Sequence, residues 1–460
     1  MKILILGGGQ VGSTVAHNLA EFSHNDVTVV DISEEALKDM SAKLDIQTLV
    51  GNAASPSVLA DAGADDSDLL LALTRSDETN LVACKLAHTL FNIPTRIARV
   101  RQSDYLEYSE QDTLALFDVN ESICPEQLVT DHLYELFAYP GALQVLNFAN
   151  GLAQMVAIRA QNGGLIVGKP LNQMKHDLPA DADCHVCAVY RNDRLIIPDA
   201  NTTIIDGDEV FFIASRKDIE LILKEVRKDP KHAKKVMIAG GGNIGFRLSR
   251  QLEKEFDLKI IENNRGRAEW LSENLDNTLV LNGSVTDESL LEQENIDEID
   301  IFCALTNDDE VNIMSALLAK RYGAKRVMAL VNRSSYVDLL QGNTIDIVIS
   351  PHLSTIGSIL AYIRRGDIEA VHPLRRGAAE TIEAIIHGDQ HTSRLIGRPI
   401  SEIDLPIGCY ISAVVRGTEV ILPHDEDIVI READHIIFFV SRRRLVKEVE
   451  KLIQVKVGFF

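Results

Sequence analysis

Two observations on the amino-acid sequence predict an α/β fold with two tandem parallel-sheet domains of Rossmann type, each followed by a small α+β domain. In each half of the chain, short apolar runs of strand length alternate with helical patterns, which is typical of βαβ units and a parallel sheet. The chain also repeats itself, because residues 2–12 (KILILGGGQVG) match residues 235–245 (KVMIAGGGNIG). A repeat of this kind indicates duplicated domains.

A shorter, strand-rich module repeats as well. Residues 168–171 (GKPL) match 397–400 (GRPI), and residues 206–212 (DGDEVFF) match 432–438 (EADHIIF). The predicted order is therefore large, small, large, small, with the main joint in the charged stretch 224–235. The predicted domains are 1–138, 139–229, 230–366 and 367–460.

Charge and hydropathy exclude several classes of protein. A formal charge of -22 repels phosphate backbones and anionic lipid head groups, so we expect no nucleic-acid binding and no direct membrane insertion. The apolar runs are far shorter than the roughly 18 to 20 residues of a membrane helix. Glycines at 7–9 interrupt the first apolar run, which indicates a buried strand and not a signal peptide, and the six cysteines are expected to be reduced thiols. We expect a cytoplasmic protein.

The first glycine loop has the context of a dinucleotide-binding motif. Gly7, Gly9 and Gly12 form a GxGxxG pattern that follows a predicted strand and opens a predicted helix. The first glycine permits a tight turn, the second lets the backbone approach a pyrophosphate, and the third allows close packing of helix on strand. Phosphate would then meet backbone N–H groups at the helix N-terminus. The alternative, glycine turns that only pack helix on strand, becomes less favourable because the loop recurs with Gly240, Gly242 and Gly245.

An acidic residue ends the second predicted strand of each half. Asp31 lies 19 residues past Gly12, and Glu262 lies 17 residues past Gly245. A carboxylate there can accept hydrogen bonds from ribose hydroxyls and repels a 2′-phosphate, which favours NAD(H) or an adenine nucleotide over NADP. These acids do not distinguish NAD from ATP or ADP.

Further candidate residues lie where later strands end, because open α/β sheets bind ligands at that edge. In each half an asparagine ends the third strand, and a Leu-Thr pair ends the fourth. An Asp-Glu pair follows that threonine. We interpret it as capping a helix N-terminus and compensating the helix dipole, and ligand contact is the less favoured alternative. The residues are Asn52, Leu73, Thr74, Asp77 and Glu78, with Asn282, Leu305, Thr306, Asp309 and Glu310 in the second half.

The fifth predicted strand breaks the symmetry between the halves. Aligning residues 97–101 with 328–332 places Arg99 opposite Leu330. An arginine beside a phosphate loop would pair with phosphate charge, although an exposed strand end is the alternative for Arg99. If Arg99 binds phosphate, the two sites differ in ligand or response.

No catalytic or metal site is predicted. The pair Cys184 and Cys187 lacks a second pair with zinc-ligand spacing and runs into an apolar strand. The sequence shows no Ser/His/Asp order and no separate catalytic domain. We therefore expect a protein that is not an enzyme.

Together the glycine loops, the repeated Ala-Leu-Thr-x-x-Asp-Glu-x-Asn segment at 72–80 and 304–312, and the paired small modules resemble the TrkA family. This is the family of regulatory subunits of bacterial Trk potassium uptake systems, in the RCK class (KTN plus TrkA-C). Two departures stand out: Gly51-Asn52-Ala53 and Leu281-Asn282-Gly283 lack the Gly-Asp pair often found after the third strand, and Leu330 replaces an arginine. The resemblance implies nucleotide sites formed by Gly7, Gly8, Gly9, Gln10, Val11, Gly12, Asp31, Asn52, Leu73, Thr74 and Arg99, and by Gly240, Gly241, Gly242, Asn243, Ile244, Gly245, Glu262, Asn282, Leu305 and Thr306.

The resemblance further implies a homo-oligomer, expected to be a tetramer, that lies peripherally on the cytoplasmic face of the inner membrane. Its partner would be a potassium transporter of the TrkH or TrkG type, gated in response to bound NAD(H) or ATP/ADP. Two alternatives stay open at this point. One is an NAD-dependent oxidoreductase, because one fold hosts many functions. The other is a free-standing nucleotide sensor that acts on soluble partners.

Overall fold

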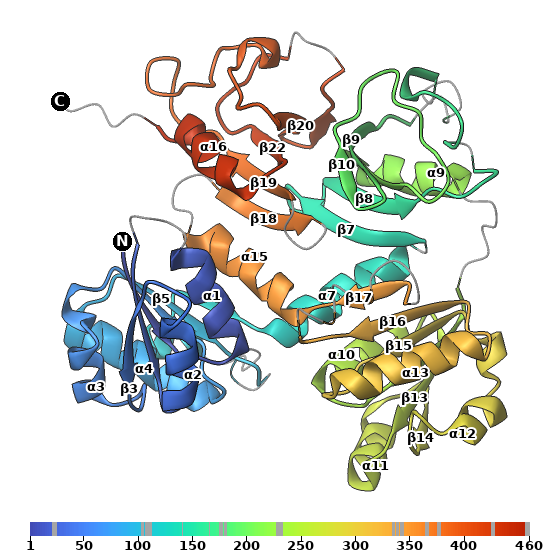
Figure 1. Cartoon of the computed structure of the whole chain (residues 1–460), viewed down its shortest axis with the longest axis horizontal. Coiled ribbons are helices and arrows are strands. Elements are labelled where there is room, and N and C mark those ends of the chain that lie inside the picture. Colours follow the sequence, from blue (N-terminus) through green and yellow to red (C-terminus); the bar gives the residue numbers. More distant parts are fainter. Residues whose placement is uncertain are drawn as a thin grey trace. The chain divides into compact units, whose positions relative to one another are not determined.

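The computed structural model (Figure 1) describes residues 1–20, 25–102, 105, 113–139, 141–164, 166–173, 178, 182–226, 233–333, 336, 340, 345–363, 368–374, 379–424 and 428–455. The chain divides into two compact units. The first comprises Met1–Val129 with Ser350–Ile359, and the second comprises Thr130–Ile349 with Leu360–Phe460. Half of the predicted joint at 224–235, residues 227–232, lies outside the described residues, as do the predicted boundaries at 229/230 and 366/367.

The described part of the first unit holds a six-stranded parallel sheet with strand order β3-β2-β1-β4-β5-β6. Its central strands are continuous apolar runs because both faces of a parallel sheet are covered by helices. The strands are β1 (Lys2–Leu6), β2 (Asp26–Asp31), β3 (Gln47–Val50), β4 (Leu69–Ala72), β5 (Thr95–Arg99) and β6 (Glu121–Ile123). The α-helices that follow them are α1 (Gln10–Ala20), α2 (Glu34–Ser41), α3 (Pro56–Asp61), α4 (Asp77–Phe91), α6 (Thr113–Leu116) and α7 (Pro125–Ala138).

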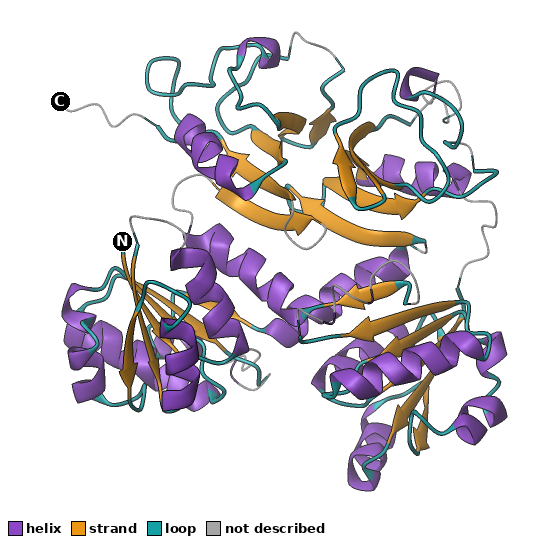
Figure 2. Cartoon of the chain, in the orientation of Figure 1, coloured by secondary structure: helices purple, strands orange, loops and turns teal. Residues whose placement is uncertain are grey.

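The second parallel sheet repeats this topology with order β14-β13-β12-β15-β16-β17, again counting described strands only. Helices pack against these strands (Figure 2). The strands are β12 (Lys235–Ala239), β13 (Asp257–Glu262), β14 (Thr278–Asn282), β15 (Ile301–Ala304), β16 (Arg326–Leu330) and β17 (Ile347–Ile349). The helices between them are α10 (Asn243–Leu252), α11 (Arg265–Asn274), α12 (Glu288–Gln293) and α13 (Asp309–Arg321). Helix α15 (Pro351–Ile363) follows β17 in the chain, and its residues up to Ile359 belong to the first unit.

Each small domain is an antiparallel sheet closed by one helix at its C-terminal end. The first has strand order β10-β9-β11-β8-β7 and the second β18-β19-β22-β20-β21. The first contains β7 (Ala142–Phe148), β8 (Ala153–Arg159), β9 (His185–Arg191), β10 (Arg194–Ile196), β11 (Glu209–Ser215) and α9 (Arg216–Val226). The second contains β18 (Ile368–Leu374), β19 (Ala379–Ile385), β20 (Cys409–Arg416), β21 (Glu419–Ile421), β22 (His435–Val440) and α16 (Val446–Ile453). The predicted α/β fold with two α+β domains is thus confirmed.

The two small domains share one hydrophobic core within the second unit. Phe148, Met155 and Phe211 of the first cluster with Ile437 and Phe439 of the second. Polar contacts cross the same junction, since the Ala149 N–H donates to Glu383 (2.9 Å) and His372 Nε2 lies 3.2 Å from the Asn147 carbonyl. Burial of large side chains at this junction stabilises the pair as one body.

No helix among the described residues is both long enough and apolar enough to cross a bilayer.

Candidate nucleotide sites

The first glycine loop joins β1 to α1 and lies against the end of β4. Gly7 adopts φ +106°, and a Cβ there would come within 2.9 Å of the Leu73 carbonyl oxygen. A Cβ on Gly12 would lie 1.8 Å from the Gly7 carbonyl oxygen. Both glycines are therefore required by the backbone itself, whatever the ligand. Gly240 and Gly245 meet the same restrictions in the second loop, with a φ of +106° at Gly240 and a Cβ contact of 2.0 Å at Gly245.

The middle glycine of each loop behaves differently. A Cβ on Gly9 or Gly242 would meet no atom of the described protein within 4 Å. The helix starts directly after each of them, at Gln10 in α1 and at Asn243 in α10. The N–H groups of a first helical turn have no partner inside the helix, so this open space is bordered by hydrogen-bond donors. The arrangement suits an oxyanion such as a pyrophosphate. Behind it, Val11 is buried and Ile244 is partly buried.

The acidic residue at the end of the second strand is tied to the glycine loop. One Asp31 oxygen accepts the Gly8 N–H at 2.6 Å, and the other accepts the Ser33 N–H at 2.7 Å. Glu262 makes the equivalent contacts, with Gly241 N–H (2.8 Å) and Asn264 N–H (2.8 Å). Each carboxylate is thus fixed at the edge of the open loop, where further lone pairs remain for ribose hydroxyls.

The two asparagines of the third strand differ between the halves. Asn52 lies two residues beyond β3, and its side-chain oxygen accepts the Ala54 N–H at 2.9 Å within its own turn. Asn282 ends β14, and its amide donates to the Glu262 carbonyl at 2.8 Å. Asn282 therefore holds the strand that carries the ribose acid, whereas Asn52 stabilises a local turn.

The threonine after the fourth strand of each sheet is hydrogen-bonded to a buried asparagine of the same half. The Asn80 side-chain oxygen accepts the Thr74 N–H (3.0 Å) and the Thr74 hydroxyl (2.7 Å), and the Asn80 amide donates to the Thr74 and Arg99 carbonyls (3.2 and 2.8 Å). Asn312 makes the same four contacts with Thr306 and Leu330. Our sequence reading assigned no role to these fully buried asparagines. Their recurrence in the repeated motif was the available signal.

Asp77 and Asp309 lie in the first turns of α4 and α13, where a carboxylate compensates the helix dipole as predicted, but the interpretation of them as helix caps is wrong. The caps are the preceding residues, because Ser76 accepts the Thr79 N–H and Asp308 accepts the Val311 N–H. Asp77 instead accepts the N–H groups of Arg101 and Gln102 (2.8 and 2.9 Å), and Asp309 accepts those of Asn332 and Arg333 (2.9 and 2.8 Å). Each carboxylate therefore points away from its own helix and fixes the backbone that follows the fifth strand of its sheet. Glu78, which follows Asp77, has a pKa lowered by its backbone hydrogen bond and by the hydrogen bond with Ser76.

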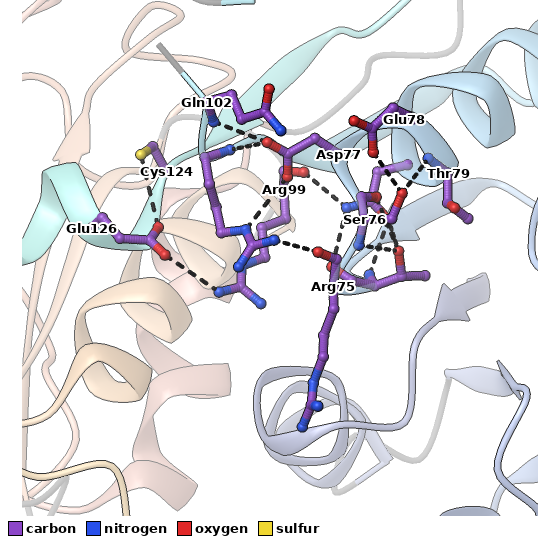
Figure 3. Close-up of polar contacts among 12 residues, drawn as sticks. Arg75, Ser76, Asp77, Glu78, Thr79, Arg99, Gln102, Cys124 and Glu126 are labelled. Carbon is purple, nitrogen blue, oxygen red and sulfur yellow. Dashed lines mark hydrogen bonds and ion pairs between the residues drawn. The ribbon is translucent and has the colours of Figure 1, made fainter. Parts of the chain in front are cut away.

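Arg99 ends β5 with an incompletely satisfied guanidinium. Its Nη2 lies 3.8 Å from a Glu126 oxygen, and both side chains are less than a fifth exposed, at 17% and 16%. The buried Nε has no hydrogen-bond partner among the described residues. Figure 3 shows Arg99 between Glu126 and Asp77. Burial lowers the pKa of Arg99, and Glu126 opposes that shift. A cation with unused donors at this edge fits a phosphate.

The second half has no such cation at the matching strand end. Leu330 ends β16 and is buried with 4% of its surface exposed. The leucines after the fourth strands are also buried, Leu73 at 4% and Leu305 at 3%. Next to Asp31, by contrast, Ile32 is 79% exposed, and the sequence reading gave it no role. An exposed apolar side chain beside a ribose acid can contact a base.

No metal site accompanies these loops. The described residues contain no group of three or more His, Cys, Asp or Glu side chains that could hold a metal ion. All six cysteines are buried, and none of them forms a disulfide bond with a described residue. Cys187 lies in the core shared by the small domains, and burial raises the pKa of its thiol to about 12.

Two family models match the chain twice each. The TrkA-N domain matches residues 3–123 and 236–351, and the TrkA-C domain matches residues 155–227 and 390–454. The first pair of matches covers the two parallel sheets and their glycine loops. The second covers most of the two antiparallel sheets.

Relatives with curated names match along the whole chain. The Trk system potassium uptake protein TrkA of Halomonas elongata is 52% identical over 460 residues, covering 100% of both chains. The protein of the same name from Vibrio alginolyticus is 48% identical and covers 99% of both. Among solved structures, the GsuK RCK domain aligns with a TM-score of 0.62 at 18% identity, covering 98% of this chain and 94% of that one. The GsuK channel bound to NAD aligns with a TM-score of 0.60, also at 18% identity, covering 98% of this chain and 78% of that one. At such identity these structures share the fold.

Proposed function

Since the chain belongs to the TrkA family, we propose that it is a regulatory subunit of a potassium uptake system and that nucleotides bound at its two glycine loops control it. The observation that carries this proposal is the duplicated site itself. Each half holds an open glycine, a helix N-terminus and a fixed carboxylate.

NAD(H) and ATP or ADP are the proposed ligands. The carboxylates of Asp31 and Glu262 are placed to accept ribose hydroxyls, and the spaces beside Gly9 and Gly242 would receive the phosphates. A solved channel with this fold carries NAD, so the fold can hold that nucleotide. The first site would bind more phosphate charge than the second. Its fifth strand ends in Arg99, whereas the matching strand of the second half ends in Leu330.

The proposed response to ligand begins at the Arg99 guanidinium. Glu126 belongs to the first turn of α7, and this helix passes at residues 129 and 130 from the first unit into the second. A phosphate that binds Arg99 would compete with Glu126. It would weaken the ion pair between Arg99 and Glu126 at the start of α7. A ligand that binds one of two arrangements more tightly shifts the population towards it. The shift would pass along α7 to the second unit.

The partner we propose is a membrane potassium transporter of the TrkH or TrkG type. The chain would bind it from the cytoplasmic face as a peripheral homo-oligomer, in the simplest case a tetramer. This assignment follows the relatives, which are potassium uptake proteins by name and match from end to end.

The decisive experiment uses the full chain with its transporter in potassium-depleted vesicles. Asp31→Ala combined with Glu262→Ala should abolish both nucleotide binding, measured by calorimetry, and the nucleotide dependence of potassium flux. The proposal fails if the double variant binds and responds like the parent chain. A substrate-dependent change in NADH absorbance with turnover would favour an oxidoreductase instead, so the same preparation should be screened for it.

A further inference from the structure

The ribose side of the second site carries a cation that the first site lacks. The second helix of each half begins at the same distance from its ribose acid, since Ser33 caps α2 and Asn264 caps α11 two residues after Asp31 and Glu262. This register places Ala36 of the first half opposite Arg267 of the second.

The charges in these matching segments are opposite in sign. Residues 31–36 contain three carboxylates and no base, whereas residues 262–267 contain one carboxylate and two arginines. The first segment is therefore anionic around its ribose acid, and the second has a net positive charge. Charges this close to one subsite change which anions it accepts.

Arg267 is held in one orientation beside the loop. Its Nε donates to the Gly241 carbonyl at 2.7 Å, and its guanidinium lies 4.1 Å from the ring centre of Trp270. Phe246 supports the same cluster, because its ring lies 4.7 Å from Trp270 in an edge-on arrangement. An arginine stacked on an indole loses little further freedom when it binds an anion.

The same guanidinium has donors left over. Among the described residues none is a hydrogen-bond partner of its two Nη groups, and the side chain is partly exposed. Gly241 links the two charges, since its N–H donates to Glu262 while its carbonyl accepts from Arg267. Burial lowers the pKa of Arg267, and the nearby Glu262 carboxylate opposes this shift. A substituent on a ribose hydroxyl held by Glu262 would therefore lie within reach of Arg267.

A carboxylate alone repels a ribose phosphate, but an adjacent arginine can accommodate it. Arginine also matches phosphate geometry with paired N–H donors. We propose that the second site accepts adenosine nucleotides with a phosphate on the ribose 2′-hydroxyl, the class of NADP(H), and that the first site rejects them. This inference rests on the proposed function, because it requires that the glycine loops bind nucleotides.

The test isolates one site at a time in the full chain. Gly9→Val blocks the first site and Gly242→Val blocks the second, since a Cβ at either position enters open space and leaves the fold unstrained. Each variant is titrated with NADPH, NADH and ATP. Because Trp270 is the single tryptophan of the chain, its fluorescence also reports binding at the second site and the integrity of the cluster. NADPH should bind the Gly9→Val chain and bind the Gly242→Val chain at least about tenfold more weakly.

Arg267→Ala and Arg267→Gln, each in the Gly9→Val chain, then test the residue. Both should weaken NADPH binding by about tenfold or more while NADH binding changes by less than about threefold. The glutamine variant retains the stem and a donor, so unchanged Trp270 fluorescence in it shows that the cluster is intact. Lys325→Ala is the control, because Lys325 is an exposed cation outside residues 262–267 and pairs with Asp300.

Three outcomes contradict the inference. Binding of NADH but not NADPH at the second site overturns it and leaves the proposed function standing. Equal losses of NADPH and NADH in the Arg267 variants also overturn it, since Arg267 would then only support the loop. Absence of NADH, NADPH and ATP binding in both single-site chains overturns the inference together with the proposed function.

Discussion

Arg99 and Glu126 face each other at 3.8 Å without a close hydrogen bond, and Arg99 Nε has no partner among the described residues (Figure 3). A buried guanidinium with unused donors is costly, and a phosphate would relieve that cost. Glu126 is therefore both the present partner of Arg99 and the competitor of any phosphate that approaches it.

We expect Glu126→Gln to raise the affinity of the first site for ATP, because the neutral amide competes less well for Arg99. Arg99→Leu, which reproduces Leu330 of the second half, should lower it by roughly 1.5–3 kcal/mol, the range for hydrogen bonds to charged groups. Calorimetry on chains that also carry Gly242→Val measures the first site alone. Lys85→Leu, which removes an exposed cation paired with Asp118, serves as the control. If neither substitution changed the ATP affinity, or if the changes had the opposite sign, Arg99 would not bind the phosphates of the ligand.

Glycines of one loop should respond differently to the same substitution. Gly9→Val should abolish nucleotide binding and leave the thermal unfolding midpoint unchanged, because its Cβ meets nothing within 4 Å. Gly12→Val should unfold the first sheet domain, since its Cβ would overlap the Gly7 carbonyl oxygen at 1.8 Å. Differential scanning fluorimetry and calorimetry separate the two effects. A stable Gly12→Val chain would contradict the close packing of this loop.

Removing the buried asparagine should loosen two strand ends at once. Asn80→Ala leaves the Thr74 N–H and the Arg99 carbonyl without partners, and each unsatisfied buried group costs about 1–3 kcal/mol. We expect destabilisation of about 2–4 kcal/mol, confined to the first sheet domain. Amide exchange of residues 95–102 under native conditions would measure it locally. Asn52→Ala, at an exposed turn, should change exchange there little.

Each small domain contains a paired Arg-Asp contact that should not tolerate lysine. Arg191 donates to both oxygens of the buried Asp208 at 2.9 and 2.8 Å. Burial raises the pKa of Asp208, but hydrogen bonds from Arg191 and the Ile205 N–H outweigh it and the pKa is lowered. Arg191→Lys loses the paired geometry and should destabilise the domain by about 1–3 kcal/mol in urea unfolding. Arg265→Lys, in an exposed pair, should cost less than about 0.5 kcal/mol.

His372 should make the junction of the small domains sensitive to acid. Burial lowers the pKa of His372 to about 4 from an ordinary value of 6.5. The unfolded chain therefore binds more protons than the folded chain between those values, so stability is full above about pH 6.5 and falls as the pH drops towards 4. His372→Gln should flatten the pH dependence of unfolding in this window. The exposed His391→Gln variant should keep the pH dependence of unfolding of the parent chain. If His372→Gln also kept that pH dependence, the assignment to His372 would be refuted.

Local patterns in the sequence were enough for the fold class and the duplicated loops. Apolar runs of strand length, glycines at fixed spacing and an acid at a strand end depend on neighbours within a few residues, so the sequence predicted the two parallel sheets, the two small domains and the positions of Asp31 and Glu262. The glycine roles were only partly foreseen. A side chain at position 12 would overlap the Gly7 carbonyl oxygen of the same loop, and the glycine spacing alone does not reveal this contact.

The contacts that distinguish the two sites join residues far apart in the chain, and only the folded structure brings them together. Asn80 reaches Arg99 across two strand ends, Asp77 fastens residues 101 and 102, and Glu126 meets Arg99 from the start of a later helix. Arg267 is an ordinary helical residue in the sequence and becomes a fixed cation only when Trp270 and Gly241 hold it. The sequence by itself determined that there are two similar loops, because the turn and the helix start are local. Tertiary structure decided how they differ, because charge acts through space and not along the chain.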